Sequence, residues 1–185
     1  MKKNLKINNF TSVLHPYPTT LITTIGVDNK PNIIAIAWIT PLSINPPVLM
    51  FALRRERYSY KLLNENKEFV VNIPNFSLIK ESLICGTYSG KEVDKFKLTN
   101  FTPVESEFVK VPSIKECIGN IECKVLDIID KKELDHVIIL GEILNVLVDE
   151  KFFDTHWDLT KVNMLLHVGG NLFTTNKNEI KKERV

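Results

Sequence analysis

The sequence predicts an all-β domain with short helices, arranged as an antiparallel Greek-key barrel or sandwich. Runs of β-branched and aromatic residues recur along the chain, the helical stretches between them are short, and strands do not alternate with helices in the βαβ manner. A length of 185 residues suits one domain with a sizeable core. We expect a single domain over residues 1–175 and a polar, charged tail over residues 176–185.

The first strands fall in the N-terminal third of the chain. Thr19–Val27 is rich in β-branched residues, and the turn residues Asp28-Asn29-Lys30 separate it from a second such run, Pro31–Ile39. The two runs therefore predict a hairpin. Pro46-Pro47 then interrupts the chain before Val48–Leu53, a strand that is apolar enough to be buried on both faces.

Three further strands complete the prediction. Glu68–Ile73 and Ile121–Ile129 are of ordinary length, whereas His136–Val148 is long enough to bend or bulge near Gly141.

Two short helices are expected between the strands. Ser59 can cap a helix that runs through Asn64 or slightly further, because its hydroxyl can accept from free amides of the first turn. Asn75 or Ser77 can cap a second helix, which should end at Gly86.

Charge and hydropathy exclude several classes of protein. The formal net charge is only +2 and basic residues are interleaved with acids, which disfavours a nucleic-acid partner. The N-terminus lacks the apolar core of a signal peptide, and the longest apolar run, Ile33–Ile39, is too short to cross a bilayer as a helix. We expect a cytoplasmic protein with no membrane partner.

The three cysteines, Cys85, Cys117 and Cys123, form no CxxC pair, and their odd number argues against a disulfide framework. They have no zinc-type spacing with the four histidines, so no metal site is expected. Buried free thiols are the favoured interpretation, and any redox chemistry should come from a bound cofactor.

Motifs of side-chain catalysis are missing. The sequence has no GxSxG, HExxH, Walker A or GxGxxG motif, and its histidines are scattered. An enzyme without such residues can borrow its reactive group, and a flavin carries its own hydride-accepting atom.

The strongest local constellation is Leu53–Lys61, which follows a buried strand and leads into a helix. Arg54, Arg55 and Arg57 offer guanidinium forks suited to phosphate, and Ser59 adds a hydroxyl near the free amides of a helix N-terminus. A phosphate cradle is one interpretation, and a solvated charged turn is the other.

The segment Ala35–Ser43 lies just upstream. Small side chains at Ala35 and Ala37 would let a planar ring approach the backbone, and Trp38 could pack beside it. The alternative is a core strand with a buried tryptophan.

Taken together and in order, short motifs from about Pro16 to Phe173 resemble those of the flavin reductase-like proteins of the FMN-binding split-barrel group, in particular the flavoredoxin-like branch. The motifs are Pro31-Asn32, Ala37-Trp38, Ser43–Pro47, Arg57-Tyr58-Ser59, Glu68–Pro74, Cys85-Gly86, Ser89-Gly90, Val93–Phe96, Pro112–Ile114, Ile121–Cys123, Asp135-His136 and Gly141-Glu142.

The resemblance implies a bound FMN and a role for particular residues. The flavin ring would lie against the backbone of Ala35, Ile36, Ala37, Trp38 and Ile39. The ribityl phosphate would be surrounded by Leu53, Arg54, Arg57, Tyr58 and Ser59, with Lys95 as a further cation near FMN. His136 resembles the histidine beside the nicotinamide in flavin reductases, although it could equally be a strand residue satisfied by Asp135 or by backbone. The resemblance also implies a homodimer.

The sequence departs from the family pattern at two places. Gly169-Gly170 is followed by Asn171, Leu172 and Phe173, where many relatives carry a tyrosine. Ala35 and Ala37 stand where reductases often have hydroxyl or amide side chains, which leaves ring contacts to the backbone.

Three functions remain open at this point. An NAD(P)H-dependent flavin reductase would take hydride from NADH or NADPH onto flavin N5 and pass electrons to an acceptor; His136 favours it. A flavoredoxin-type electron carrier would exchange electrons with protein partners without productive nicotinamide binding, and the departures after Gly170 favour it. The third is a flavin-binding barrel with another redox substrate.

Overall fold

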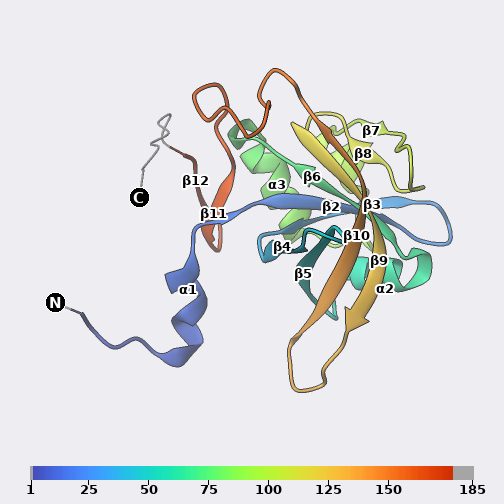
Figure 1. The fold of residues 1–185 in the computed structure, drawn as a ribbon. Coiled ribbons are helices and arrows are strands. Elements are labelled where there is room, and N and C mark those ends of the chain that lie inside the picture. Colours follow the sequence, from blue (N-terminus) through green and yellow to red (C-terminus); the bar gives the residue numbers. More distant parts are fainter. Residues whose placement is uncertain (1, 177–185) are drawn as a thin grey trace.

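The computed structural model describes residues 2–176, and its main element is a seven-stranded antiparallel sheet in the order β3-β2-β6-β9-β10-β5-β4. The sheet curls on itself, with α2 at one side and α3 close to β2 and β3 (Figure 1). Its strands are β2 (Thr20–Ile25), β3 (Pro31–Ile36), β4 (Ile39–Ser43), β5 (Val48–Arg54), β6 (Glu68–Ile73), β9 (Gly119–Ile129) and β10 (His136–Val148). This mainly antiparallel, curled architecture confirms the predicted fold class.

Small sheets and short helices complete the fold. Two minor sheets are formed by β1 (Tyr17–Pro18), β11 (Leu166–Gly169) and β12 (Leu172–Thr174), and by β7 (Pro103–Val104) and β8 (Ser113–Ile114). The helices are η1 (Ile7–Asn9), α1 (Phe10–Leu14), α2 (Tyr58–Asn66), η2 (Phe76–Leu78), α3 (Ile79–Thr87) and α4 (Lys95–Thr99). No helix in the described part of the chain is long and apolar enough to cross a membrane.

Both faces of the central strands are covered, because successive residues of a strand point to opposite faces. In β2, Ile22 packs with Phe51 and Phe69 inside the curl of the sheet. Its neighbour Leu21 packs on the other face, in a cluster that includes Cys85 of α3. Helices thus cover the outer face of β2 and β3, and two of them, α3 and α4, pack against the edge strand β3.

Most predicted strands occur where the sequence placed them. Glu68–Ile73 and His136–Val148 have the predicted bounds. The predicted bulge near Gly141 is confirmed by a register shift between Leu140 and Gly141. A side chain there would have no room, since a Cβ atom added to Gly141 would lie 2.3 Å from the ring of Phe69.

Two strand predictions need correction. Pro31–Ile39 is not one strand: β3 ends at Ile36 and β4 begins at Ile39, because the chain passes here from one edge strand of the main sheet to the other. The strand at Val48–Leu53 is not buried on both faces along its length, since Met50 is only half-buried.

The helix boundaries also differ from expectation. Ser59 does not cap α2; the helix begins at Tyr58 after Arg57, and Ser59 lies inside its first turn, held by a side chain from β3. Asn75 does act as a cap, accepting from the backbone N–H of Ser77 at the start of η2. The following α3 continues through Thr87, past Gly86.

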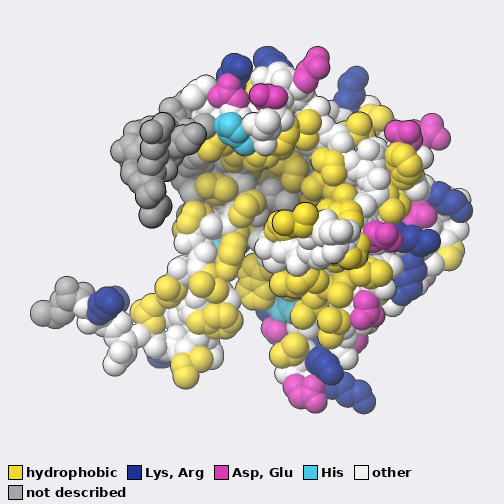
Figure 2. Space-filling view, in the orientation of Figure 1, with side chains coloured by type: hydrophobic (Ala, Val, Ile, Leu, Met, Phe, Trp, Pro, Cys, Tyr) yellow, Lys and Arg dark blue, Asp and Glu magenta, His cyan; other side chains and the backbone are white. Residues whose placement is uncertain are grey.

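The N-terminal arm projects away from the sheet, whereas all but the first residue of the expected polar tail, residues 177–185, lie outside the described part of the chain (Figure 1). The arm carries exposed hydrophobic side chains, which Figure 2 shows as a yellow band leading away from the body. They are Leu5, Ile7, Phe10, Val13 and Leu14. Exposed apolar side chains gathered on one projecting segment are typical of a segment that packs on a partner.

Candidate functional site

Three adjoining hollows form one groove along β3, with volumes of about 300, 410 and 270 Å³. Arg57, which precedes the first residue of α2, lines all three hollows. The groove therefore follows the edge strand β3 of the main sheet, from the first turn of α2 to the small sheet β1-β11-β12. We call the end at α2 the cationic end.

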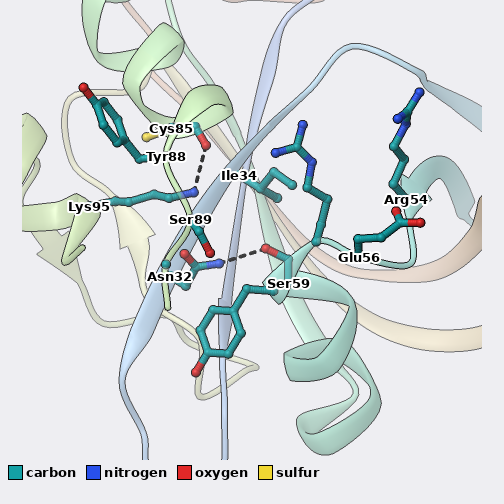
Figure 3. Close-up of a pocket in the computed structure, with 12 residues that line it drawn as sticks. Asn32, Ile34, Arg54, Glu56, Ser59, Cys85, Tyr88, Ser89 and Lys95 are labelled. Carbon is teal, nitrogen blue, oxygen red and sulfur yellow. Dashed lines mark hydrogen bonds between the residues drawn. The ribbon is translucent and has the colours of Figure 1, made fainter. Parts of the chain in front are cut away.

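The cationic end gathers side chains from β3, the β5–α2 turn, α3 and α4 (Figure 3). Arg54, Arg57 and Lys95 supply three positive charges, and two carboxylates face them: Glu56 in the lining, and Asp135, which lies 3.7 Å from Arg54. Arg54 and Arg57 come from a turn whose exit is the N-terminus of α2, where backbone N–H groups favour anions. This donor set suits a phosphate group.

A hydrogen bond fixes the floor of the cationic end. The Asn32 side-chain amide donates to the Ser59 hydroxyl oxygen over 2.8 Å, and both residues are buried. The Ser59 hydroxyl proton is therefore left to donate elsewhere. The Asn32 carbonyl oxygen is buried without a hydrogen-bond partner. A ligand with an acceptor for Ser59 and a hydroxyl donor for Asn32 would satisfy both groups.

Gly90 closes over Asn32 from the segment after α3. A Cβ atom at Gly90 would lie 2.0 Å from the Asn32 carbonyl oxygen, so only glycine allows the backbone to approach this closely. Ser89 and Gly90 both line the cationic end.

Lys95 is a buried cation, with only 4% of its surface exposed. Its ammonium group donates to the backbone carbonyls of Ile33, over 2.6 Å, and Cys85, over 2.8 Å. These two bonds use two of the three N–H donors of the ammonium group, so the third can donate to a ligand. Burial lowers the pKa of Lys95 to about 8, so it remains mainly protonated at neutral pH.

The middle of the groove is lined by small side chains on the edge strand. Ala35 and Ala37 line the second hollow, and Gly86 of α3 faces them from the other side. In an antiparallel strand the backbone groups of alternate residues point to the same side. Because the Ile33 carbonyl points outward to Lys95, the N–H and C=O of Ala35 also point away from β2, where a planar ligand could bond to them.

Trp38 and His136 form one wall of the second hollow. Their ring centroids lie 4.9 Å apart with an interplanar angle of 32°. His136 Nδ1 lies 2.8 Å from a carboxylate oxygen of Asp135, and Arg54 lies 3.7 Å from the other oxygen. The hydrogen bond from His136, aided by the charge of Arg54, lowers the pKa of the Asp135 carboxyl below its usual value.

The second hollow is also lined by His15 and His167, to which the sequence alone assigned no role. Pairing of β1 with β11 brings these segments together, and the two imidazole rings lie 5.3 Å apart. Asn171 and Phe173, which mark the departure from the family pattern, line the third hollow. No sequence motif linked residue 15 to residue 167, because their proximity depends on tertiary pairing.

The structure brings together most of the predicted cofactor residues. Those that line the groove are Ala35, Ile36, Ala37, Trp38, Leu53, Arg54, Arg57, Tyr58, Ser59 and Lys95, with His136 beside them. Ile39 does not join them; it lines a separate apolar hollow behind Trp38. Arg55, considered for phosphate binding, instead bonds to the β9–β10 hairpin.

Among the cysteines, the preference for buried free thiols is confirmed: Cys85, Cys117 and Cys123 are unpaired and buried. Burial raises the pKa of the Cys85 thiol to about 12, so it is not a thiolate at neutral pH. Within residues 2–176, no cluster of three or more His, Cys, Asp or Glu side chains could hold a metal ion.

A family model described as the flavin reductase like domain matches residues 12–175. The chain belongs to this family. It is 39% identical over 175 residues to an uncharacterised protein of Archaeoglobus fulgidus, covering 94% of this chain and 96% of that protein. It is also 27% identical over 139 residues to a protein of Kitasatospora aureofaciens named flavin reductase (NADH), covering 74% of this chain and 70% of that one.

Solved structures of similar fold extend over nearly the whole chain. The flavoredoxin of Desulfovibrio vulgaris (Miyazaki F) is 30% identical with a TM-score of 0.87, covering 98% of this chain and 97% of that chain. A protein with a split barrel domain from Shewanella frigidimarina is 19% identical with a TM-score of 0.87, over 98% and 94% of the two chains, and shares the fold. The predicted split-barrel resemblance is thereby confirmed, and the family supports a flavin-binding redox function.

Proposed function

We propose that this protein binds FMN in the groove, with the phosphate at the cationic end and the ring along Ala35–Ala37. The observation that carries the proposal is the juxtaposition, in one groove, of Arg54, Arg57 and Lys95 with a strip of small residues on an edge strand. An anion site next to a flat slot with free backbone groups matches a phosphate joined to a planar ring.

The buried polar groups between the two ends suit the ribityl chain. The unpartnered Asn32 carbonyl oxygen can accept from a ribityl hydroxyl, and the Ser59 hydroxyl can donate to the phosphate. A buried oxygen without a donor and a buried hydroxyl without an acceptor are both unusual in a protein that carries no ligand. They support a ligand that has hydroxyl donors and an anionic group.

Bound FMN supplies the redox chemistry, since its N5 accepts a hydride and the reduced ring passes electrons onward. The residues of the chain bind and orient it. Arg54, Arg57, Ser59 and Lys95 hold the phosphate, and Ala35 presents its backbone N–H and C=O to the edge of the ring. Trp38 and His136 shield one side of the hollow from water.

We propose that the electron donor is NADH or NADPH, bound against the ring beside His136. Hydride transfer requires two parallel rings in close contact more than an acid or a base. With its Nδ1–H directed at Asp135, the half-buried imidazole of His136 can accept at Nε2 from the NH2 group of a nicotinamide carboxamide. The Kitasatospora aureofaciens relative named flavin reductase (NADH) supports this choice.

A flavoredoxin-type electron carrier is the second candidate. Two flavoredoxins, from Desulfovibrio vulgaris (Miyazaki F) and Methanosarcina acetivorans, are each 30% identical to this chain with TM-scores of 0.87 and 0.85. Asn171 and Phe173 stand in the groove where a family tyrosine is expected, which supports a site that does not use nicotinamide productively.

A homodimer is part of the same proposal. The exposed hydrophobic side chains of the N-terminal arm would be covered by a second copy, close to the groove that Thr11 and Ser12 also line. Three buried free thiols agree with a reducing compartment such as the cytoplasm.

Anaerobic mixing of the FMN-loaded protein with NADH or NADPH tests the reductase. We expect loss of the absorbance of oxidised flavin, and a higher KM for the nucleotide in His136→Ala with unchanged FMN affinity. Lys132→Ala on the nearby hairpin is the control. Full flavin loading without bleaching by either nucleotide, combined with reduction by a protein donor, would instead establish the electron carrier.

A further inference from the structure

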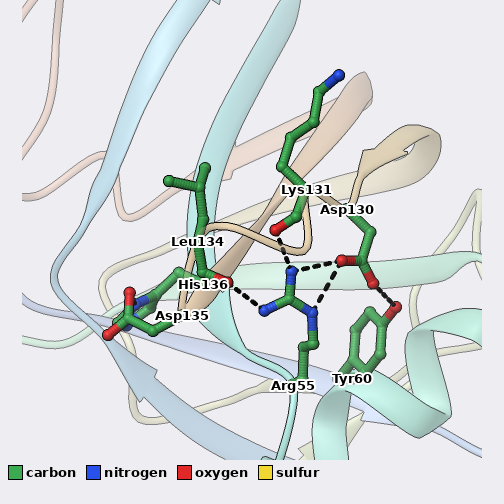
Figure 4. A network of polar contacts seen from close by, with 7 residues as sticks. All are labelled: Arg55, Tyr60, Asp130, Lys131, Leu134, Asp135 and His136. Atoms are coloured by element: carbon green, nitrogen blue, oxygen red, sulfur yellow. Dashed lines mark hydrogen bonds and ion pairs between the residues drawn. The ribbon is translucent and has the colours of Figure 1, made fainter.

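Arg55 joins two segments that both reach the groove but lie far apart in sequence. Its Nε donates to the Asp130 carboxylate over 2.8 Å. Its terminal nitrogens donate to the Lys131 backbone carbonyl, over 2.6 Å, and to the Leu134 backbone carbonyl. One guanidinium therefore binds both sides of the turn between β9 and β10 (Figure 4).

The contact has a second anchor on α2. The Tyr60 hydroxyl donates to the other Asp130 oxygen over 2.9 Å. Hydrogen bonds from Arg55 and Tyr60 hold the pKa of Asp130 below its usual value, so its carboxylate stays charged across the neutral range. The planar guanidinium of Arg55 has five N–H donors and can therefore donate to a carboxylate and two carbonyls at once. A lysine ammonium cannot donate to all three with the same geometry.

Each segment continues directly into the groove. On one side, Arg55 lies between Arg54 and Arg57 of the cationic end. On the other side, the turn ends at Asp135, and the next residue, His136, forms the wall of the groove with Trp38. Arg54 and His136 are register partners across β5 and β10, so the fork sits one residue away from the place where the two segments pair.

We propose that Arg55 is a positioning residue, which holds the β9–β10 turn against the start of α2 and thereby sets the position of His136 over the groove. The functional part of this inference rests on the proposed nicotinamide site, whereas the geometric part does not. Without the Arg55 guanidinium, the turn would be tied to the β5–α2 segment only by the Tyr60–Asp130 hydrogen bond and the Arg54–Asp135 ion pair, and the imidazole would lose its fixed distance from Trp38.

The chain offers a matched set of variants. Arg55→Lys keeps the charge and removes the fork, and Tyr60→Phe removes a single hydrogen bond should Arg55→Lys fail to fold. Lys131→Ala is the control, because the Lys131 side chain points away from Arg55 while its carbonyl remains to accept (Figure 4).

The first readout needs no cofactor and no activity. In a Trp157→Phe background, the fluorescence of Trp38 should fall as His136 becomes protonated, because an imidazolium in contact with an indole quenches it. We expect this pH-dependent quenching to lose most of its amplitude in Arg55→Lys, to persist in Lys131→Ala and to vanish in His136→Ala. Equal amplitudes in Arg55→Lys and its parent would overturn the proposal. So would a parent without quenching, since the contact would then be absent.

The second readout is a double-mutant cycle on the KM for NADH or NADPH, with FMN affinity measured separately. Arg55→Lys should raise the KM about five- to tenfold and have little further effect when His136 is already alanine. Additive effects would show that Arg55 does not act through His136. Failure of the wild-type protein to bleach would contradict the proposed reductase alone, and the fluorescence result would still decide the role of Arg55.

Discussion

The side-chain amide of Asn32 donates to the hydroxyl of Ser59 over 2.8 Å, although 27 residues separate them. This bond ties the edge strand β3 to the first turn of α2, and so joins the part of the groove suited to a ring to the part suited to a phosphate. It also directs the Ser59 hydroxyl proton away from Asn32, which makes Ser59 a donor to a ligand.

Removing that hydroxyl should weaken FMN binding. In Ser59→Ala the phosphate loses a donor and the buried Asn32 amide loses its acceptor, so we expect the Kd for FMN to rise about tenfold or more. Quenching of FMN fluorescence on titration with protein measures this. Ser77→Ala, on η2 outside the groove, is the control. A Ser59→Ala protein with wild-type affinity would show that the phosphate does not reach this turn.

Arg57 lines every part of the groove, so its loss should weaken FMN binding more than the loss of a nearby surface cation. We expect Arg57→Ala to raise the Kd for FMN about ten- to a hundredfold, since hydrogen bonds to charged groups are the stronger ones. Lys61→Ala on the exposed side of α2, where Lys61 pairs only with Glu65, should leave the Kd within error. If the two variants raised the Kd for FMN equally, Arg57 would contribute only its positive charge and no direct contact with the phosphate.

FMN binding should depend on pH through Lys95. Burial lowers the pKa of Lys95 to about 8 in the free protein, and a bound phosphate dianion would raise it. Binding is therefore favoured while the ammonium is charged and weakens as the pH rises above about 8. Isothermal titration in buffers of different ionisation enthalpy should detect proton uptake on binding. Lys95→Met should bind FMN more weakly and lack this pH dependence; an unchanged profile would contradict the assignment.

Gly141 should be intolerant of a side chain for reasons of packing alone. A methyl group there would meet the buried ring of Phe69 at 2.3 Å, and the strand pairing on both sides of β10 leaves little room to move. We expect Gly141→Ala to lower the free energy of unfolding by about 1–3 kcal/mol. Urea denaturation followed by circular dichroism measures this, and a wild-type midpoint would mean that the bulge absorbs the methyl group.

The sequence predicted the long strands because their patterns are local. Glu68–Ile73 and His136–Val148 are bounded by turn residues and carry β-branched runs, so their limits were readable without the fold. The break at Ala37-Trp38 was missed, because nothing in the apolar run from Ile33 signals that the chain passes there from one edge of the sheet to the other. The short strands β1, β11 and β12 carry too few residues for any pattern.

The residues of the candidate site divide in the same way, into those that a local segment indicates and those whose position depends on the fold. Arg54, Arg57 and Ser59 lie within one short segment, and the resemblance could therefore indicate them together. Two placements could not be predicted: Ile39 lies in a separate hollow behind Trp38, and Arg55 bonds to the β9–β10 turn. Both depend on which way a side chain points after the sheet has closed. The wall formed by His15 and His167 likewise depends on pairing between the two ends of the domain.

The central claim, that the groove holds FMN by its phosphate, is tested most directly by comparing FMN with riboflavin in a fluorescence titration of the apoprotein. The two ligands share the ring and the ribityl chain and differ only in the phosphate. We expect tight, stoichiometric quenching of FMN, and riboflavin binding that is weaker by about a hundredfold or more. Equal affinities, or no binding of either ligand, would contradict it.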